Sequence, residues 1–487
     1  MSHADLRSAV RPPPDAAMAD IADYVIDYRI QSQEAFDTAC HMLLDSLACA
    51  ALAMDHPGCV RHLGPLVPGA VLPGGARVPF TTHELDPVQA AYNIGVQIRW
   101  LDFNDTWLAA EWGHPSDNLG AILAVADYLG RSAQSSGNPV LSVRDVLEFA
   151  IKAHEIQGCY ALKNSFNRVG LDHVILVRLA STAVATAMLG GGKEQIIAAI
   201  SHSWIDNGVL RTYRHAPNTG PRKSWAAGDA CRRAVTHALN AVKGEVGYPS
   251  AISAQTWGFQ EVAFKGQPFE FERPFGSYVM ENILFKISYP AEFHAQTAVE
   301  CAMQLHAQVG ARIDAEGADA IEAIVIHTQE AAMRIIDKTG PLANYADRDH
   351  CLQYIVAVPL LSGRLRADDY GDAVAADPRI DALRDRMRVE EEPRFTRDYY
   401  DPDKRYIGNA VQVFFKDGTS SDKVSIDYPV GHRRRRGEGI PLLMAKFDAA
   451  IEAKLPARQV ATLRALMSEP GQLMAQPVTG LMDLLQG

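Results

Sequence analysis

Two short segments in the first quarter of the chain contain the residue types that acid–base chemistry requires. The first contains Asp102 and Thr106, and the second contains His114 followed by Pro115. A proline loses no hydrogen bond in the first turn of a helix, so this spacing predicts a helix that begins directly after His114. Free N–H groups at a helix start attract anions, and a histidine titrates near neutral pH. We therefore expect proton transfer on a carboxylate substrate at His114.

The same residues also have structural interpretations. In the functional interpretation, Asp102 orients His114 or relays a proton to it, and Thr106 binds the substrate. In the structural one, the aspartate and threonine form a turn that ends a helix, and His114 caps or packs against its neighbours. The residue types alone leave both interpretations open, with the functional one favoured for His114.

Composition narrows the class of protein. The 487 residues carry a net charge of −11, which argues against general nucleic-acid binding and means that an anionic substrate has to be attracted by a local basic cluster. The seven cysteines are scattered, without a Cys-x-x-Cys pair, which is typical of reduced thiols and argues against an iron–sulfur cluster. The apolar segment 35–54 is interrupted by charges and is predicted to be a core helix. We expect a cytoplasmic protein with no metal, cofactor, nucleic-acid or membrane partner.

The two segments resemble the MmgE/PrpD family, whose pattern is an Asp-Asp-Thr stretch followed by His-Pro-Ser. Here Asn104-Asp105-Thr106 and His114-Pro115-Ser116 occupy these positions, and Asp117-Asn118 follows. The asparagine at 104 and the Asp-Asn pair match the subgroup that dehydrates 2-methylcitrate. The resemblance extends over nearly the whole chain and implies an all-helical domain with an inserted α+β lid, an active site between them, and a homodimer.

The resemblance also implies candidate residues farther along the chain. Lys223 precedes a helix rich in small residues, where the family has an active-site lysine; its structural alternative is a solvated loop charge. Arg211 and Arg214 are weaker candidates for binding a carboxylate. The segment that contains Lys286 and His294 resembles a lysine–aromatic–Pro-Ala element bordering the family's site, although His294 has the alternative of an ordinary helix-face residue.

Two further segments are less decisive. Residues 346–354 match the same subgroup, which makes Asp349, His350 and Tyr354 candidates for the site or its support, with helix capping and core packing as the alternative. The four arginines at 433–436 are interpreted as a solvated face, part of the anion site, or a dimer contact.

Hydrophobic periodicity predicts the organisation of the chain. Helices are expected over 35–54, 86–101, 119–129, 143–162, 174–189, 193–207 and 228–241. Strand-like segments follow at 282–288, 321–327, 388–395, 410–415 and 423–427, with helices at 292–309 and 352–365 between them and a hairpin turn at 416–418. We predict a mainly α fold: a helical domain formed by 1–276 and 431–487, and an α+β lid over 277–430.

Together these observations predict catalytic roles for His114, Asp102 and Lys223. The substrate-binding residues are expected to be Thr106, Arg211, Arg214, Lys286, His294 and Tyr354. The reaction that the resemblance implies is metal-independent loss of water from 2-methylcitrate, which gives 2-methyl-cis-aconitate in propionate breakdown. The alternatives are decarboxylation of cis-aconitate, or another citrate-like acid lyase reaction on the same scaffold, and a non-catalytic protein that binds a tricarboxylate.

Overall fold

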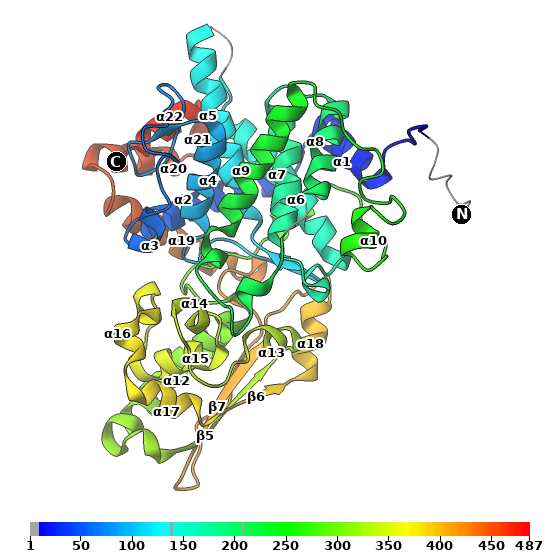
Figure 1. Cartoon of the computed structure of the whole chain (residues 1–487). Helices are drawn as coiled ribbons and strands as arrows, with labels where there is room; N and C mark the ends of the chain where they lie inside the picture. Colours follow the sequence, from blue (N-terminus) through cyan, green and yellow to red (C-terminus); the bar gives the residue numbers. More distant parts are fainter. Residues whose placement is uncertain (1–8, 137–139, 207–208) are drawn as a thin grey trace.

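The computed structural model describes residues 9–136, 140–206 and 209–487 (Figure 1). The fold is mainly α-helical, as predicted. The strands that the structure describes form two two-stranded sheets and one four-stranded sheet.

The N-terminal half is built from helices, and periodicity predicts all of those named next except the first and the third. They are α1 (Ala16–Asp27), α2 (Gln33–Ala53), α3 (Pro57–Val60), α4 (Pro87–Arg99), α5 (Leu119–Ser136), α6 (Val143–Lys163), α7 (Val174–Met188), α8 (Lys193–Ile205) and α9 (Arg222–Val242). The predicted end of the eighth helix at residue 207 lies outside the described residues. Helix α9 begins six residues before the predicted start, so Lys223 lies in its first turn and not in a loop.

Helix α2 alone, among the described helices, is long and apolar enough to cross a membrane, and most of it is buried inside the protein.

Close packing of α4 against α9 brings two parts of the site together. Asp86 caps the start of α4 by accepting hydrogen bonds from the N–H groups of the second and third helical residues. A Cβ atom placed on Gly95 of α4 would lie only 2.8 Å from the Cα atom of Gly228 in α9. The two helix backbones therefore approach each other where neither residue has a side chain. This contact places the end of α4, which carries Arg99, near the start of α9.

The structure contains two large hydrophobic cores. The first uses side chains between residues 18 and 287 and again between residues 430 and 485, and the second uses side chains between residues 291 and 426. The C-terminal helices α19 (Arg436–Glu452), α20 (Ala457–Met467), α21 (Pro470–Ala475) and α22 (Val478–Leu484) return to the first core, where α19 packs against α2 (Figure 1). The exact limits 276/277 and 430/431 stay predictions.

The second core lies around the four-stranded sheet, at the bottom of Figure 1. Strand β5 (Ile321–Thr328) pairs in parallel with β6 (Met387–Glu391) and antiparallel with β7 (Asn409–Phe415), which pairs antiparallel with β8 (Val424–Ile426). The predicted hairpin between β7 and β8 is confirmed. The helices of this region are α12 (Gln296–Glu316), α13 (Glu330–Ile336), α14 (Tyr345–Arg348), α15 (Leu352–Ser362), α16 (Asp372–Ala375), α17 (Pro378–Arg384) and α18 (Pro393–Tyr400).

One strand prediction extends too far and another is wrong. The segment 388–395 leaves the sheet after Glu391 because Pro393 opens helix α18, and the side chain of Glu392 caps it by accepting from the N–H of Arg394. The segment 282–288 makes only an isolated bridge, in which Leu284 exchanges backbone hydrogen bonds with Thr106 at 2.7 and 3.0 Å. This bridge carries the following lysine, at position 286, to the site.

Candidate active site

A small buried cavity of about 20 Å³ lies between residues of the segment 99–214 and residues of the segment 286–350. Its walls are formed by Arg99, Asp102, Thr106, Leu108, Trp112, His114, His173, Arg211, Arg214, Lys286, Glu292, Phe293, Ile335 and His350. Four of these side chains are cationic and two are carboxylates, whereas the whole chain has a net charge of −11. The cavity is therefore locally positive, as an anionic substrate requires.

His114 is positioned by the turn that it precedes. Pro115 opens a 3₁₀ turn (Pro115–Asn118) that continues into α5, so the predicted helix start is present. The Nδ1 atom of His114 lies 2.6 Å from the backbone oxygen of Asp105. A carbonyl oxygen only accepts hydrogen bonds, so we assign the proton to Nδ1 and the free electron pair to Nε2. Burial lowers the pKa of His114 well below its usual value, and Arg99 adds to this effect. His114 is therefore a neutral imidazole able to accept a proton at Nε2.

Asp102 supplies a buried negative charge beside that nitrogen. Its Oδ1 atom lies 3.3 Å from Nε2 of His114 and 3.1 Å from Nζ of Lys286, and the carboxylate also pairs with Arg99. Burial favours the protonated form, but Arg99 and Lys286 outweigh it and hold the pKa of Asp102 well below its usual value. Asp102 has φ of 51° in the turn that follows α4, where its N–H donates to the backbone oxygen of Arg99 at 3.2 Å, so it does belong to a turn after a helix. The turn interpretation does not account for its carboxylate contacts, which also stabilise a protonated His114.

Lys223 lies next to the cavity without lining it. Its ammonium pairs with Asp349 and lies 3.1 Å from Nδ1 of His350, and that nitrogen is 2.7 Å from Oδ1 of Asp349. Only His350 of these three lines the cavity. The side chain of Lys223 is 3% exposed, so the alternative of a solvated loop charge is wrong. Burial lowers the pKa of Lys223, although Asp349 opposes this effect.

Arg211 and Arg214 form a basic wall of the cavity. Arg214 pairs with Asp172, with one hydrogen bond at 3.2 Å. Arg211 donates from Nε to Nε2 of His215 at 3.1 Å and lies over the ring of Trp112. The buried Nη1 atom of Arg211 has no hydrogen-bond partner among the described residues. A buried donor without a partner is costly, and an anion in the cavity would satisfy it.

His173 is the main residue that sequence reasoning missed. Its ring centroid is 5.8 Å from that of His114, and it borders the same cavity. Within the part of the chain that the structure describes, neither ring nitrogen has a hydrogen-bond partner, although Nδ1 is 3.4 Å from a carboxylate oxygen of Asp172. Burial lowers the pKa of His173 well below its usual value. The only sequence signal was its adjacency to an aspartate, which is too common to identify a site.

Arg99 and Glu292 also border the cavity without having been assigned a role from the sequence. Arg99 lies at the end of α4 and pairs with Asp102. Glu292 accepts a 2.8 Å hydrogen bond from the backbone N–H of His294. The carboxylate of Asp102 thus pairs with Arg99 and also faces His114.

His294 and Tyr354 do not line the cavity. Both ring nitrogens of His294 are occupied, at 2.8 Å from Oε1 of Glu292 and 3.1 Å from the hydroxyl of Tyr399. The Tyr354 hydroxyl donates to the backbone oxygen of Asp369 at 2.7 Å, inside the second core. The structure therefore favours supporting or packing roles for these two residues over the predicted substrate contacts.

The basic run at 433–436 is also outside the cavity. Arg433 and Arg436 pair with Glu34, and Arg435 pairs with Glu300. These contacts tie the start of the C-terminal segment to the rest of the protein.

In the described ranges, no group of three or more His, Cys, Asp or Glu side chains is arranged to hold a metal ion.

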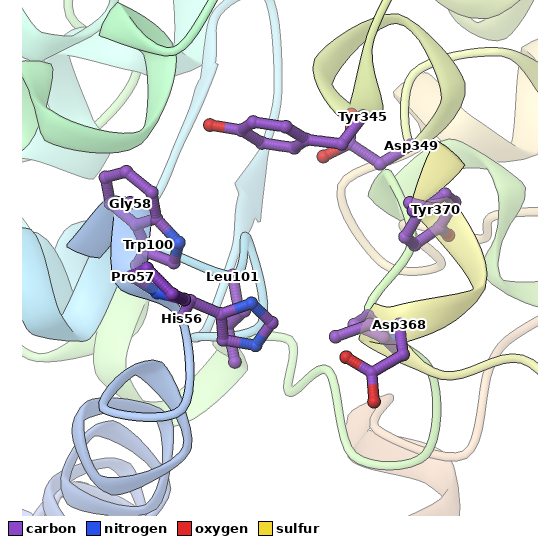
Figure 2. Close-up of a pocket in the computed structure, with 12 residues that line it drawn as sticks. His56, Pro57, Gly58, Trp100, Leu101, Tyr345, Asp349, Asp368 and Tyr370 are labelled. Carbon is purple, nitrogen blue, oxygen red and sulfur yellow. The ribbon is translucent and has the colours of Figure 1, made fainter. Parts of the chain in front are cut away.

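A larger hollow of about 290 Å³ lies on the other side of Asp349, the partner of Lys223 and His350 (Figure 2). Figure 2 shows Trp100 on one side and Tyr345, Asp349 and Asp368 on the other. Asp349 faces the hollow, whereas its neighbour His350 faces the small cavity. Aromatic and acidic walls do not suit a polyanion, so the hollow is not a second anion site.

Fold and cavity define a mainly helical protein with a buried histidine–aspartate pair among cations. The MmgE/PrpD N-terminal domain model matches residues 19–272, and the C-terminal domain model matches residues 289–469. The chain belongs to the MmgE/PrpD family, as predicted.

Curated relatives are similar over nearly their full length. A 2-methylcitrate dehydratase of Cupriavidus necator is 59% identical over 480 residues, 99% of each chain. One of Salmonella typhimurium is 58% identical over 475 residues, 98% of each chain. A mitochondrial 2-methylcitrate dehydratase of Yarrowia lipolytica is 57% identical over 460 residues, 94% of this chain and 88% of the relative.

Proposed function

We propose that this protein removes water from 2-methylcitrate to form 2-methyl-cis-aconitate, by acid–base catalysis without a metal. The observation that carries the proposal is the position of His114, whose Nε2 lies 3.3 Å from Oδ1 of Asp102 inside a cationic cavity. The names and near-complete coverage of the curated relatives support the choice of substrate.

Substrate binding uses the local positive charge. 2-Methylcitrate has three carboxylates, and the cavity offers the guanidinium groups of Arg99, Arg211 and Arg214 and the ammonium of Lys286. The buried Nη1 of Arg211 lies 3.8 Å from a carboxylate oxygen of Asp172 but has no hydrogen-bond partner in the described part of the chain. It therefore binds a carboxylate without first breaking an internal hydrogen bond. Planar guanidinium groups also orient carboxylates by paired hydrogen bonds.

The elimination starts at His114. Its Nε2 takes the proton from the carbon next to a substrate carboxylate, and Asp102 stabilises the imidazolium that forms. The electron pair of the broken C–H bond becomes the second bond of the alkene, and the C–O bond to the neighbouring hydroxyl breaks. The hydroxyl leaves as water after it receives a proton. His173 and His350 both border the cavity, but burial lowers the pKa of each, so neither is a charged acid. The proton that His114 has taken is then the one passed to the leaving hydroxyl.

The substrate needs more room than the described cavity provides. A cavity of about 20 Å³ is the size for a single water molecule. Binding therefore requires the second core to move away from the first, which is the role of the proposed α+β lid at 277–430 over the helical domain at 1–276 and 431–487. The hollow in Figure 2 is lined by residues of both parts, so it lies where the two would separate. We also propose that the protein is cytoplasmic and forms a homodimer, as the family resemblance implies.

Incubation of the purified protein with 2-methylcitrate and, separately, with cis-aconitate tests the function. We expect an alkene product from 2-methylcitrate, detected by ultraviolet absorbance and mass spectrometry, and no carbon dioxide from cis-aconitate. Carbon dioxide release without dehydration would instead favour a decarboxylase. Saturable binding of 2-methylcitrate without turnover would favour a binding protein.

A further inference from the structure

Lys446, in the C-terminal helix α19, places its charge directly behind the candidate site. Its side chain is 7% exposed and pairs with Asp45 of α2 at 2.8 Å. The same ammonium donates to the backbone oxygens of Phe103 at 3.1 Å and of Lys286 at 3.0 Å. It also lies 3.4 Å from the centroid of the Phe103 ring. One buried cation therefore holds two segments that are distant from each other in the sequence.

Those two segments carry Asp102 and Lys286, which form an ion pair beside His114. Phe103 directly follows Asp102, whose backbone has a positive φ of 51°, a conformation that a non-glycine residue keeps only when its surroundings hold it. The ammonium of Lys286 binds both the carboxylate of Asp102, at 3.1 Å, and its backbone oxygen, at 2.7 Å. Lys446 thus contacts the main chain on both sides of this pair. It does not line the cavity, so it has no direct contact with a substrate there.

We propose that Lys446 is a positioning residue, which holds the main chains at Phe103 and Lys286 so that Asp102 keeps its place against His114. The proposal rests on the proposed function for its catalytic consequence. Asp45 balances the charge of Lys446. Burial by itself lowers the pKa of Lys446, but Asp45 and Cys49 outweigh burial and raise that pKa above its usual value. Lys446 therefore stays charged at neutral pH and keeps its hydrogen bonds to both carbonyl groups.

Lys446→Met tests the proposal because methionine keeps an unbranched side chain and removes the ammonium. Lys446→Gln keeps two N–H donors on a shorter side chain and serves as the graded variant. Lys454→Met is the matched control: Lys454 also links the C-terminal segment to the end of α2, through Asp55, but it makes no hydrogen bond to a site segment. For each variant, kcat and KM for 2-methylcitrate are measured after circular dichroism has shown a native fold.

We expect Lys446→Met to lower kcat on the order of 10²-fold with little change in KM, because a misplaced catalytic group slows the reaction more than it weakens binding. Lys446→Gln should lie between it and the wild type, and Lys454→Met should match the wild type. A kcat for Lys446→Met equal to that of Lys454→Met would overturn the proposal. If the methionine variant does not fold, the same comparison is made with the glutamine variant.

Hydrogen exchange provides a test that does not depend on turnover. In the variants of Lys446, but not in Lys454→Met, the backbone amides of residues 102–106 should exchange faster with solvent. Unchanged exchange in this segment would overturn the positioning role. A wild-type protein inert toward 2-methylcitrate would count against the proposed function alone, because the exchange comparison still decides the role of Lys446.

Discussion

Asp102→Asn tests the electrostatic argument most directly, because it removes the charge and nearly preserves the shape. In the wild type, Asp102 pairs with Arg99 and Lys286 and faces His114. The variant leaves two buried cations without this partner. We therefore expect a loss of stability and a larger loss of activity, with different dependences on pH.

The stability effect follows from the burial of the pair. Asp102 is 4% exposed, so its interactions are little screened by solvent, and removal of one partner from a buried ion pair costs about 3–5 kcal/mol. The folded-state pKa of Asp102 is depressed, so its contribution is present above the unfolded pKa of about 3.9 and is lost as the pH falls through the lower folded value. The difference in unfolding free energy between wild type and variant should therefore shrink below about pH 4.

The catalytic effect has a separate pH signature. Loss of the group that stabilises protonated His114 should lower kcat on the order of 10²- to 10⁴-fold. Asp102 raises the pKa of His114, so its removal lowers that pKa further. The acid limb of the rate profile, where His114 becomes protonated, should then move to lower pH even as the plateau falls.

Chemical denaturation and pH–rate profiles of both proteins check these expectations. Asp127→Asn is the matched control, since Asp127 is a fully buried carboxylate that pairs with Arg131 at 3.0 Å and does not line the cavity. The control should lose stability and keep its kcat and the position of its acid limb. An acid limb that stays in place in Asp102→Asn, or a kcat loss equal to that of the control, would refute the role assigned to Asp102.

Four further predictions follow from the site. His114→Asn should lower kcat on the order of 10²- to 10⁴-fold in a folded protein, and retention of more than about a tenth of wild-type kcat would count against a base at this position. Lys223→Ala should raise KM and lower kcat, because it leaves Asp349 buried without its ammonium partner; wild-type kinetics would contradict this. Tyr354→Phe removes only a hydrogen bond to a backbone oxygen in the second core, so kcat should be unchanged, and a large loss would return Tyr354 to the site. Treatment with a chelator should leave the rate unchanged, because the cysteines and histidines lack the close spacing of metal ligands in the sequence, and activity restored only by iron would contradict it.

The local parts of the site could be predicted because local sequence determines them. Pro115 after His114 predicts a helix start, and the structure has a 3₁₀ turn and helix α5 there. The helices of the first core follow from apolar residues at three- and four-residue spacing. Errors arose where a short signal competed with that pattern. The strand-like residues 388–395, for example, contain Pro393, which starts a helix.

The sequence by itself thus determined most of the longer helices, the hairpin of β7 and β8, and the family to which the chain belongs. Only the tertiary structure decided which charges meet: Lys286 is 184 residues from Asp102, and Lys446 is 343 residues from Phe103. It also decided that His173 faces the cavity and that both ring nitrogens of His294 are bonded elsewhere. Sequence patterns report interactions within a turn or a strand pair, whereas these pairings depend on how distant segments pack.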